Sequence, residues 1–452
     1  MLPSSRRLLV LDDDPTGSQC VSQMPVAFEE DTKLIHQTLA DPSSACFVLT
    51  NSRALDEEDA VAKNRRILTG VLADFGENAK SAGLHLVSRS DSTLRGHVLA
   101  EPNALADTLA DAGIETDAFI FCPAMIEAGR FTEGNIHYAV VDGQPVRVQD
   151  TDFAKDATFG YRHSDLPAFL EEKSGGAISA DQVLTLSLDE IRSGVDAVVR
   201  KLAAARNRTW VVVNATDYSD METVADAITQ LEAQGHVFIT RCGPSFVRPL
   251  AGQQGAQVLA AQDIPLDRER LEHGLLVVGS HVGLTTQQLA QVQAQSGLAE
   301  HELQVEKLLD KAERAAHIEE TVAQIRQNLE NNDCVVYTSR TLVSTDDPAE
   351  SLAISRSVSD AVVEVVQKVR TARPAWVIAK GGITSHEVAH RGLGIRLATA
   401  EGQFFPGQIS LFTPVEAPPE VLGTPYVVFP GNVGGRDALA EVVARLKSAA
   451  TA

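Results

Sequence analysis

The sequence predicts an α/β fold of two domains with mainly parallel sheets, and its length, apolar runs and helical periodicity all point there. With 452 residues, the chain is long enough for two or three domains at about 100–200 residues each. Apolar runs of about four residues, without polar alternation, are typical of strands buried on both faces, as in parallel sheets. Between these runs, apolar residues recur every three to four positions, as they do along one face of a helix.

The predicted strands are short apolar runs that lead into turn-forming or charged residues. In chain order they are Leu8–Leu11, Cys46–Leu49, Leu84–Val87, Ala118–Phe121, Trp210–Val213, Val237–Ile239, Leu275–Val278, Cys334–Tyr337, Trp376–Ile378 and Tyr426–Phe429. Helical periodicity is clearest over Val61–Phe75, Ala361–Val369 and Leu439–Leu446. Because strands and helices alternate, we expect helices on both faces of each sheet. The segment 140–190 has weak periodicity, and no element is assigned to it.

Composition and charge bound the partners of this chain. Hydrophobic residues make up 44% and charged residues 22%, and the formal net charge is −22. Such an acidic surface repels nucleic-acid phosphates and anionic lipid, so we expect neither a nucleic-acid nor a membrane partner. A small anionic substrate would need local arginines or backbone N–H groups to bind it. The composition is also compatible with a homo-oligomer.

The cysteines and the N-terminal segment indicate a reducing compartment. The five cysteines are scattered and none forms a CxxC pair, which argues against disulfides and cysteine-based zinc sites. The apolar run Leu8–Leu11 is too short for a signal peptide, and three aspartates end it. No stretch approaches the ~18 apolar residues of a membrane span. We therefore expect a cytoplasmic protein.

Residues that follow the predicted strands are the candidates for ligand binding, because ligands of parallel sheets bind beyond the carboxyl ends of the strands. In the first half these residues are rich in aspartate and arginine, and in the second half they are rich in glycine and serine. The change predicts one site for a polar acid and another that cradles phosphates. The boundary is expected within Ala251–His273.

Two acidic turns in the first half carry candidate chemistry. Asp12-Asp13-Asp14-Pro15-Thr16-Gly17 follows the first strand, and its carboxylates can accept a proton from a hydroxyl or hold Mg²⁺ through water. Ser90–His97 combines hydroxyls with Asp91, a candidate base, and Arg95, a candidate anion ligand. The alternatives are a solvated acidic turn for the first segment and a helix N-cap for the second.

Glycine turns in the second half predict a nucleotide site. Paired glycines in Lys380-Gly381-Gly382-Ile383-Thr384-Ser385 let the backbone approach a phosphate closely, at what looks like the start of a helix. Gly279-Ser280 and Gly431-Asn432 repeat this pattern after two other strands. The sequence contains neither a P-loop nor a strand followed by GxGxxG, which disfavours P-loop and Rossmann dehydrogenase functions.

A zinc site is an alternative for the segment that follows. His386-Glu387-Val388-Ala389-His390 matches the HExxH pattern, in which two histidines on one helical face bind zinc and the glutamate acts as a base. Leu393 and Arg396 occupy the positions where the extended motif has glycine and a third histidine. Two histidines one turn apart on a surface helix also need no metal.

Taken together, these motifs resemble the four-carbon acid sugar kinases, along nearly the whole chain. The resemblance rests on Asp12–Gly17, Asp91–Gly96, Pro123-Ala124, Glu127–Arg130, Gly134–Tyr138, Ser245–Arg248, Gly381–Ser385 and Pro430–Asn432. It implies a sugar-acid-binding domain over residues 1–260, a nucleotide-binding domain over residues 261–452, and an active site in the cleft between them. The family transfers the γ-phosphate of ATP, with Mg²⁺, to the terminal hydroxyl of threonate, erythronate or 3-oxo-tetronates.

The resemblance also assigns residues to both sites. The substrate would be held by Asp12, Arg53, Arg89, Asp91, Ser92 and Thr93, with the arginines on its carboxylate and Asp12 or Asp91 as the base. ATP would contact Ser280, Gly381, Gly382, Ile383, Thr384 and Gly431, and no residue is assigned as a metal ligand. The family usually has an acid at position 383 and glycine at position 386, so nucleotide binding could differ here. Rival functions are an HExxH zinc-dependent hydrolase and a catalytically degenerate nucleotide-binding protein.

Overall fold

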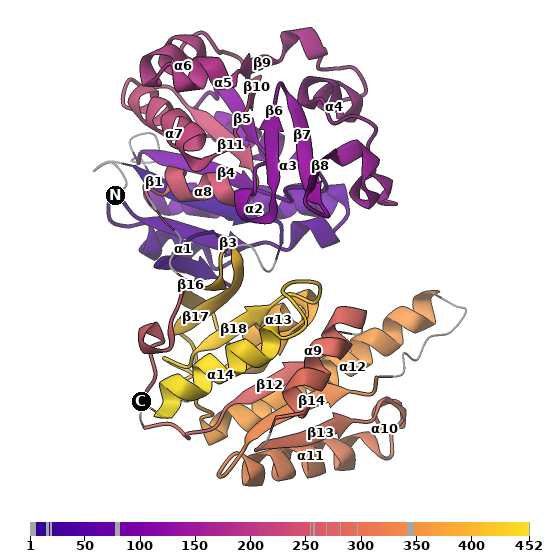
Figure 1. Cartoon of the computed structure of the whole chain (residues 1–452). Helices are drawn as coiled ribbons and strands as arrows, with labels where there is room; N and C mark the ends of the chain where they lie inside the picture. Colours follow the sequence, from indigo (N-terminus) through magenta and orange to yellow (C-terminus); the bar gives the residue numbers. More distant parts are fainter. Residues whose placement is uncertain are drawn as a thin grey trace. The chain divides into compact units, whose positions relative to one another are not determined.

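The chain divides into two compact α/β units, Met1–Ala256 and Gln257–Ala452 (Figure 1). The computed structural model describes residues 6–14, 18, 20–76, 82–253, 255, 258–267, 269–280, 282–295, 297–340 and 348–451. Pro15, Thr16 and Gly17 of the first acidic turn lie outside the described residues. In each unit, helices cover both faces of a mainly parallel sheet, which confirms the predicted fold class.

The first unit is built on a parallel sheet with the strand order β2-β3-β1-β4-β11-β5-β10-β9. Its strands are β1 (Arg7–Asp12), β2 (Met24–Ala27), β3 (Ala45–Leu49), β4 (Leu84–Arg89), β5 (Ala118–Cys122), β9 (Leu184–Leu186), β10 (Thr209–Val213) and β11 (Phe238–Cys242). Asp12 pairs in register with Arg89, and Arg89 pairs with Cys242. The ends of the central strands β1, β4 and β11 therefore lie at one level of the sheet.

Two groups of helices cover this sheet. One group is α1 (Thr32–Thr38), α2 (Glu57–Phe75) and α3 (Ala100–Asp111), and the other is α5 (Leu188–Arg192), α6 (Val195–Leu202), α7 (Tyr218–Glu232) and α8 (Pro244–Leu250). Helix α2 begins four residues before the predicted Val61, because the Asp56 side chain accepts a hydrogen bond from the Asp59 amide and caps the first turn. Its buried face includes Ile67, Leu68 and Val71.

The segment 140–190, left unassigned by sequence analysis, contributes the last strand of a small antiparallel sheet and a helix. The sheet comprises β6 (Arg130–Glu133), β7 (Ile136–Val141) and β8 (Gln144–Arg147), and the helix is α4 (Leu166–Lys173). Residues of β8 are mostly exposed. A small, partly exposed sheet lacks long apolar runs, which explains why the sequence pattern was weak here.

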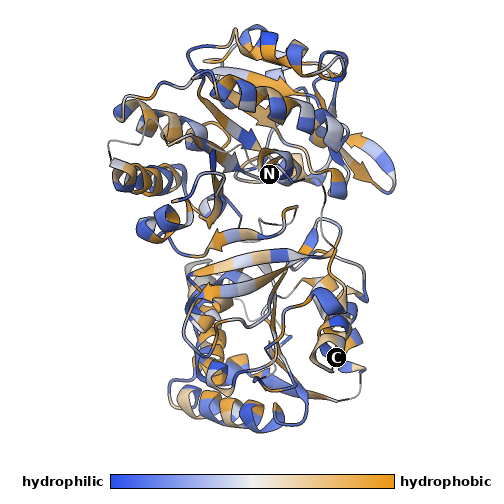
Figure 2. Cartoon of the chain, turned by 90° about the vertical axis from the view of Figure 1, so that its left-hand side faces the viewer, coloured by the Kyte–Doolittle hydropathy of each residue, from blue (hydrophilic) through white to orange (hydrophobic). Residues whose placement is uncertain are grey.

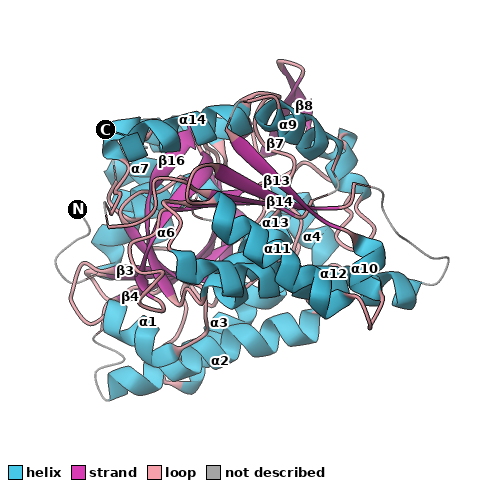
Figure 3. Ribbon diagram, turned by 90° about the horizontal axis from the view of Figure 1, so that it is seen from below, coloured by secondary structure: helices cyan, strands magenta, loops and turns pink. Residues whose placement is uncertain are grey.

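The second unit has the strand order β13-β14-β12-β15-β18-β17-β16. Its parallel strands are β12 (Leu275–Val278), β13 (Leu298–Leu303), β14 (Asp333–Thr338), β15 (Val377–Lys380) and β18 (Tyr426–Phe429), and the antiparallel hairpin β16 (Leu397–Phe405) and β17 (Gln408–Glu416) extends them. Helices α9 (Gly283–Gln293) and α14 (Ala438–Thr451) lie on one side of β13 and β14, and α11 (Arg314–Asn328) and α12 (Pro348–Val369) lie on the other (Figure 3).

Each apolar run that the sequence analysis assigned to a strand overlaps a strand of the structure. Strands are predominantly hydrophobic and most helices carry one polar face (Figure 2). The hairpin of β16 and β17 was missed because β16 alternates between buried and partly buried positions over much of its length, whereas the analysis searched for continuous apolar runs. Within the described chain, no helix combines the length and apolarity that a membrane crossing requires.

Candidate active site

Asp12 and Arg89 form a buried ion pair at the carboxyl ends of β1 and β4. Arg89 Nη1 lies 2.7 Å from Asp12 Oδ1, and only 0% of Asp12 and 3% of Arg89 are exposed. The Asp14 amide donates to the same Asp12 oxygen at 3.0 Å. Burial raises the pKa of Asp12 to about 6, although the Arg89 charge opposes this shift. Two predicted substrate ligands are thus brought together and fixed.

Asp13, the next residue, is also buried, but its carboxylate accepts no hydrogen bond from the described residues. It is 1% exposed. Arg53 Nη1 lies 4.0 Å from Asp13 Oδ1. Burial raises the pKa of Asp13 to about 7, with Arg53 lowering it and Glu101 raising it further. Sequence analysis did not choose Asp13 among the three adjacent aspartates.

Gly96 makes room for the Asp13 carboxylate. Its φ is +106°, and a Cβ at this position would lie 2.8 Å from Asp13 Oδ2. A side chain here would therefore be strained by its backbone conformation and would collide with Asp13. The last position of the Asp91–Gly96 motif thus requires glycine, because its backbone lies close to the first acidic turn.

Asp91 accepts two hydrogen bonds on one of its oxygens and lies near Arg53 through the other. Thr93 Oγ1 and Arg95 Nε both donate to Asp91 Oδ2, the latter at 2.7 Å. Arg53 Nη1 lies 3.8 Å from Asp91 Oδ1, and Arg53 Nη2 pairs with Asp14 Oδ2. Burial by itself raises the pKa of Asp91, but Arg53 and Arg95 outweigh it and the net pKa is lowered. Asp91 is therefore ionised at neutral pH and held in place.

Side chains from the small sheet region support the loop that carries Ser92 and Thr93. His137 Nε2 lies 2.8 Å from the Ser92 carbonyl oxygen, and His137 Nδ1 lies 2.9 Å from Thr132 Oγ1. Burial lowers the pKa of His137 to about 4, so the ring is neutral at pH 7. Because a carbonyl only accepts, Nε2 carries the proton and Nδ1 accepts from Thr132. Tyr161 donates to the Thr93 carbonyl at 2.8 Å.

A second buried ion pair, missed by sequence analysis, lies behind these residues. Arg241 Nη1 on β11 donates to Glu101 Oε2 at 2.5 Å and to Ser88 Oγ at 2.6 Å. Ser52 donates to the other oxygen of Glu101. Arg241 lies two residues after the predicted strand Val237–Ile239, but nothing in the sequence marks Glu101 in α3 as its partner. Charged groups thus line the carboxyl-end edge from β1 to β11.

In the second unit, the three predicted glycine turns meet. A Cβ on Gly381, whose φ is +122°, would lie 3.1 Å from both Ser280 Cβ and Thr384 Oγ1. A Cβ on Gly279 would lie 2.4 Å from Thr384 Oγ1, and one on Gly431 would lie 3.0 Å from Ser280 Oγ. The ends of β12, β15 and β18 therefore approach one another only because these positions lack side chains.

Polar side chains join the glycine turns. Thr285 Oγ1 donates to the Gly431 carbonyl at 2.9 Å. Lys380 Nζ donates to the carbonyls of Pro430 at 2.5 Å and Gly431 at 3.3 Å, and this lysine is 0% exposed. Burial lowers the pKa of Lys380 to about 7. Arg340 Nη1 donates to the Ser280 carbonyl at 2.7 Å.

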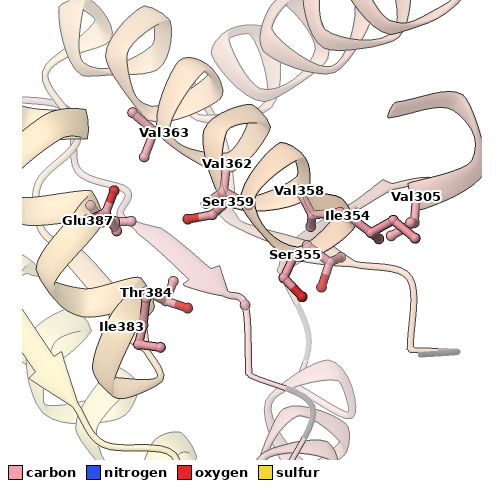
Figure 4. Close-up of a pocket in the computed structure, with 13 residues that line it drawn as sticks. Val305, Ile354, Ser355, Val358, Ser359, Val362, Val363, Ile383, Thr384 and Glu387 are labelled. Atoms are coloured by element: carbon pink, nitrogen blue, oxygen red, sulfur yellow. The ribbon is translucent and has the colours of Figure 1, made fainter. Parts of the chain in front are cut away.

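A pocket of about 200 Å³ opens beside these turns. Figure 4 shows its wall of α12 side chains opposite Ile383, Thr384 and Glu387 of α13 (Gly382–Glu387). It is lined by Gly279, Val305, Thr338, Ile354, Ser355, Val358, Ser359, Val362, Val363, Ile383, Thr384, Glu387 and Val388. An apolar wall with a few polar groups is typical of sites for flat organic ligands. Gly279, Ile383 and Thr384 thus belong to both the turns and the pocket.

The HExxH segment has no metal-site geometry in the structure. The His386 and His390 rings are 5.8 Å apart between centroids, and Glu387 pairs with Arg391 at 2.7 Å. Helix α13 ends at Glu387, and a π-helical turn, Val388–Leu393, follows. Among the residues that the structure describes, no three His, Cys, Asp or Glu side chains are grouped to hold a metal ion. The zinc-dependent hydrolase is not favoured.

Two family models match the chain, one over each unit. Residues 8–250 match a sugar-binding N-terminal domain, and residues 275–439 match a nucleotide-binding C-terminal domain. The first model covers the edge that carries Asp12, Arg89 and Asp91. The second covers the glycine turns and the pocket.

Individual relatives agree with the family models. The chain is 26% identical over 334 residues to a D-erythronate kinase of Heliobacterium modesticaldum, covering 72% of this chain and 69% of that protein.

Solved structures share the fold at low identity. A putative tRNA synthase from Salmonella typhimurium LT2 has a TM-score of 0.68 at 15% identity, covering 96% of this chain and 98% of its own. A Haemophilus influenzae protein of the DUF1537 family has a TM-score of 0.66 at 18% identity, covering 97% and 99%. On its domain models, its fold and its motifs, the chain belongs to the four-carbon acid sugar kinase family.

Proposed function

We propose that this protein is an ATP-dependent kinase that phosphorylates a terminal hydroxyl of a small sugar acid. The substrate class is four-carbon acids such as threonate, erythronate and 3-oxo-tetronates. The relative named D-erythronate kinase supports this class, and the two family models support a sugar site and a nucleotide site. Residues 1–260 supply the acceptor site and residues 261–452 supply the donor site.

The observation that carries the proposal is the buried Asp13 carboxylate with two oxygens unbonded by described residues. Phosphoryl transfer needs a group that orients the attacking hydroxyl and receives its proton. Thr93 and Arg95 both donate to one oxygen of Asp91, and the lowered pKa of Asp91 makes it a weak base. Asp12 is tied to Arg89. Asp13, with a pKa raised to about 7, is the best proton acceptor of the three.

Around Asp13, each neighbouring residue has a role that its contacts support. Asp12 and Arg89 hold each other and set the position of the first acidic turn. Asp91 and Thr93 shape the second turn. The Ser92 hydroxyl, whose contact in the structure is the Met125 sulfur at 3.7 Å, would turn to bind a substrate hydroxyl. Arg53 bridges the two acidic turns through Asp14 and Asp91. These residues position the sugar acid, and Asp13 receives the proton of its attacking hydroxyl group.

The donor site uses shape and backbone groups rather than carboxylates. Gly279, Gly381 and Gly431 lie close to the Ser280 and Thr384 side chains, so the three turns bring two hydroxyl groups together where phosphate oxygens would bind. The adjoining apolar pocket suits the base of the nucleotide. Ile383 is 73% exposed, so its side chain can cover a ligand instead of holding a metal ion. Gly382 precedes Ile383 in the same turn.

Mg²⁺ is implied by ATP use, and the carboxylate chemistry of the chain fits it. Mg²⁺ in kinases binds mostly phosphate oxygens and water, with one or two protein carboxylates. Asp12 Oδ2 is buried without a hydrogen bond from described residues, so it offers a suitable donor atom. When bound, the ion neutralises negative charge on the phosphates.

A coupled assay of ADP release tests the proposal directly. The purified protein is given ATP, Mg²⁺ and each of the tetronates, 3-oxo-tetronates and longer aldonates, with a no-acid control. We expect ADP release with at least one four-carbon acid, and one phosphorylated product by mass spectrometry. Nucleotide binding without turnover of any acid would contradict the proposal and favour a degenerate nucleotide-binding protein. Activity that persists with Mg²⁺ removed but requires zinc would favour the hydrolase.

A further inference from the structure

Arg130 is a largely buried arginine that forms no ion pair with a carboxylate of the described residues, although the Asp91 charge partly opposes the lowering of its pKa by burial. It opens β6, and its backbone exchanges two 2.9 Å hydrogen bonds with Met125. Its Nη1 lies 3.6 Å from the Met125 sulfur, and its guanidinium carbon lies 5.6 Å from the centre of the Phe153 ring. Its buried Nε has no acceptor among the described residues. A thioether and an aromatic ring are weak partners for a full positive charge.

Five other buried or half-buried arginines of this unit have acidic partners. Arg53 pairs with Asp14, Arg89 with Asp12, Arg95 with Asp91, Arg241 with Glu101 and Arg248 with Glu127. Burying a guanidinium without an anion is costly, because desolvation is not offset. Burial accordingly lowers the pKa of Arg130. Binding of an anion would therefore offset more of the desolvation cost at Arg130 than at an arginine that already has an acidic partner.

The position of Arg130 is next to the proposed acceptor site. Ser92 Oγ contacts the same Met125 sulfur at 3.7 Å that Arg130 contacts at 3.6 Å. Arg95 also lies over the Phe153 ring, at 5.3 Å from its centre. The loop Asp91–Gly96 and the start of β6 are therefore joined by Met125 and Phe153, and an acid bound to that loop lies within reach of Arg130.

We propose that Arg130 binds the carboxylate of the sugar acid and thereby makes the enzyme prefer acids to neutral polyols. The inference rests on the proposed function and differs from the expectation that Arg53 and Arg89 hold the carboxylate, since both already have acidic partners. The planar fork of a guanidinium matches a carboxylate with two parallel hydrogen bonds. The Met125 sulfur is displaced at little cost.

The test compares Arg130→Met with Arg147→Met, a matched control at an exposed position of β8. Calorimetry measures binding of D-erythronate, of its neutral amide and of a non-hydrolysable ATP analogue to each variant. We expect Arg130→Met to lower the erythronate-to-amide preference about 100-fold, as expected for a lost buried charge pair. Nucleotide affinity should stay within twofold, Arg130→Lys should recover part of the preference, and Arg147→Met should match the wild type.

Three results would overturn the inference, and they point to different faults. If Arg130→Met binds erythronate like the wild type, the carboxylate is held elsewhere while the kinase function stands. If acid and amide weaken equally, Arg130 only shapes the loop. If the wild type neither binds nor phosphorylates any acid of the ADP-release screen, the proposed function fails as well. Should Arg130→Met not fold, Arg130→Lys decides, with a preference at wild-type level counting against the inference.

Discussion

The carboxyl-end edges of the two sheets carry different kinds of residues. In the first unit the edge is filled with buried charge, from the Asp12–Arg89 pair to Arg241 and Glu101. In the second unit it is made of glycine turns, hydroxyls and an apolar pocket, and Lys380 is bonded to carbonyls instead of carboxylates. Buried charges at the edge of the first unit shift the pKa values of its carboxylates. Close backbone packing at the edge of the second unit determines which ligand shape can bind. We infer that the acceptor acid is activated electrostatically, whereas the nucleotide is recognised by shape.

The largest expected effect is that of Asp13→Asn on turnover. Removing the proton acceptor should lower kcat about 10³-fold, within the usual range for general bases, with little change in nucleotide affinity. Steady-state kinetics on the acid selected by the screen measures this loss. The control is Asp152→Asn, since Asp152 has a side chain that is 96% exposed. A kcat within tenfold of the wild type would return the base to Asp12 or Asp91.

The same variant should also change the dependence of stability on pH. The pKa of Asp13 is raised from 3.8 to about 7 on folding, so the protonated form stabilises the fold below pH 3.8. That contribution is lost as pH rises through 7. Asp13→Asn should therefore gain stability relative to the wild type as the pH rises from 4 to 7. Urea unfolding at several pH values measures the gain, and a constant difference would contradict the raised pKa.

Gly381→Val should have the next largest effect, and it acts on the other edge. The side chain would meet Ser280 and Thr384 in a backbone conformation with φ of +122°, so we expect nucleotide affinity to fall about 100-fold while acid binding is kept. Calorimetry with a non-hydrolysable ATP analogue checks this. Gly283→Ala is the control, because a Cβ there meets nothing within 4 Å. Equal losses for acid and nucleotide would indicate misfolding and not a donor-site defect.

Lys380 gives a smaller effect of opposite sign to that of Asp13. Its pKa is lowered from 10.5 to about 7, so it contributes stability above pH 10.5 that is lost as pH falls through 7. The wild type should therefore gain stability between pH 7 and 10, and Lys380→Met should flatten this rise. Denaturant unfolding monitored at Trp376, which is buried in the second unit, measures it. An unchanged slope would mean that Lys380 is charged throughout.

The smallest effect is expected for the HExxH segment. His386→Ala and His390→Ala should each change turnover less than twofold, because the described residues provide no third ligand for a zinc ion. Treatment with a zinc-selective chelator should likewise leave activity intact when Mg²⁺ is supplied. Loss of activity that zinc restores would reinstate the hydrolase.

Much of the fold and of the edge chemistry follows from local sequence. Continuous apolar runs such as Leu275–Val278 report burial on both faces, and the residues after them must lie at one edge of a parallel sheet. This reasoning grouped Gly279, Gly381 and Gly431 as strand-end turns, and the structure places them close together. Alternating strands such as β16 carry a weaker signal and were missed.

Pairings between distant residues could not be predicted in this way. Whether Asp12 or Asp13 has a partner depends on which one Arg89 reaches across β1 and β4. Glu101 is one acid among many on helices until Arg241 is placed against it, 140 residues away. The pocket needs α12 to pack near α13, and that packing depends on the whole unit. Side-chain partners at such distances are set by the three-dimensional fold.

The division of labour between the two edges can be measured most directly by hydrogen–deuterium exchange with each ligand alone. We predict that a non-hydrolysable ATP analogue protects amides around Gly279, Gly381 and Gly431. D-erythronate should instead protect amides around Asp13, Asp91 and Arg130. Protection of the first acidic turn by the nucleotide alone, with the glycine turns unchanged, would contradict the account.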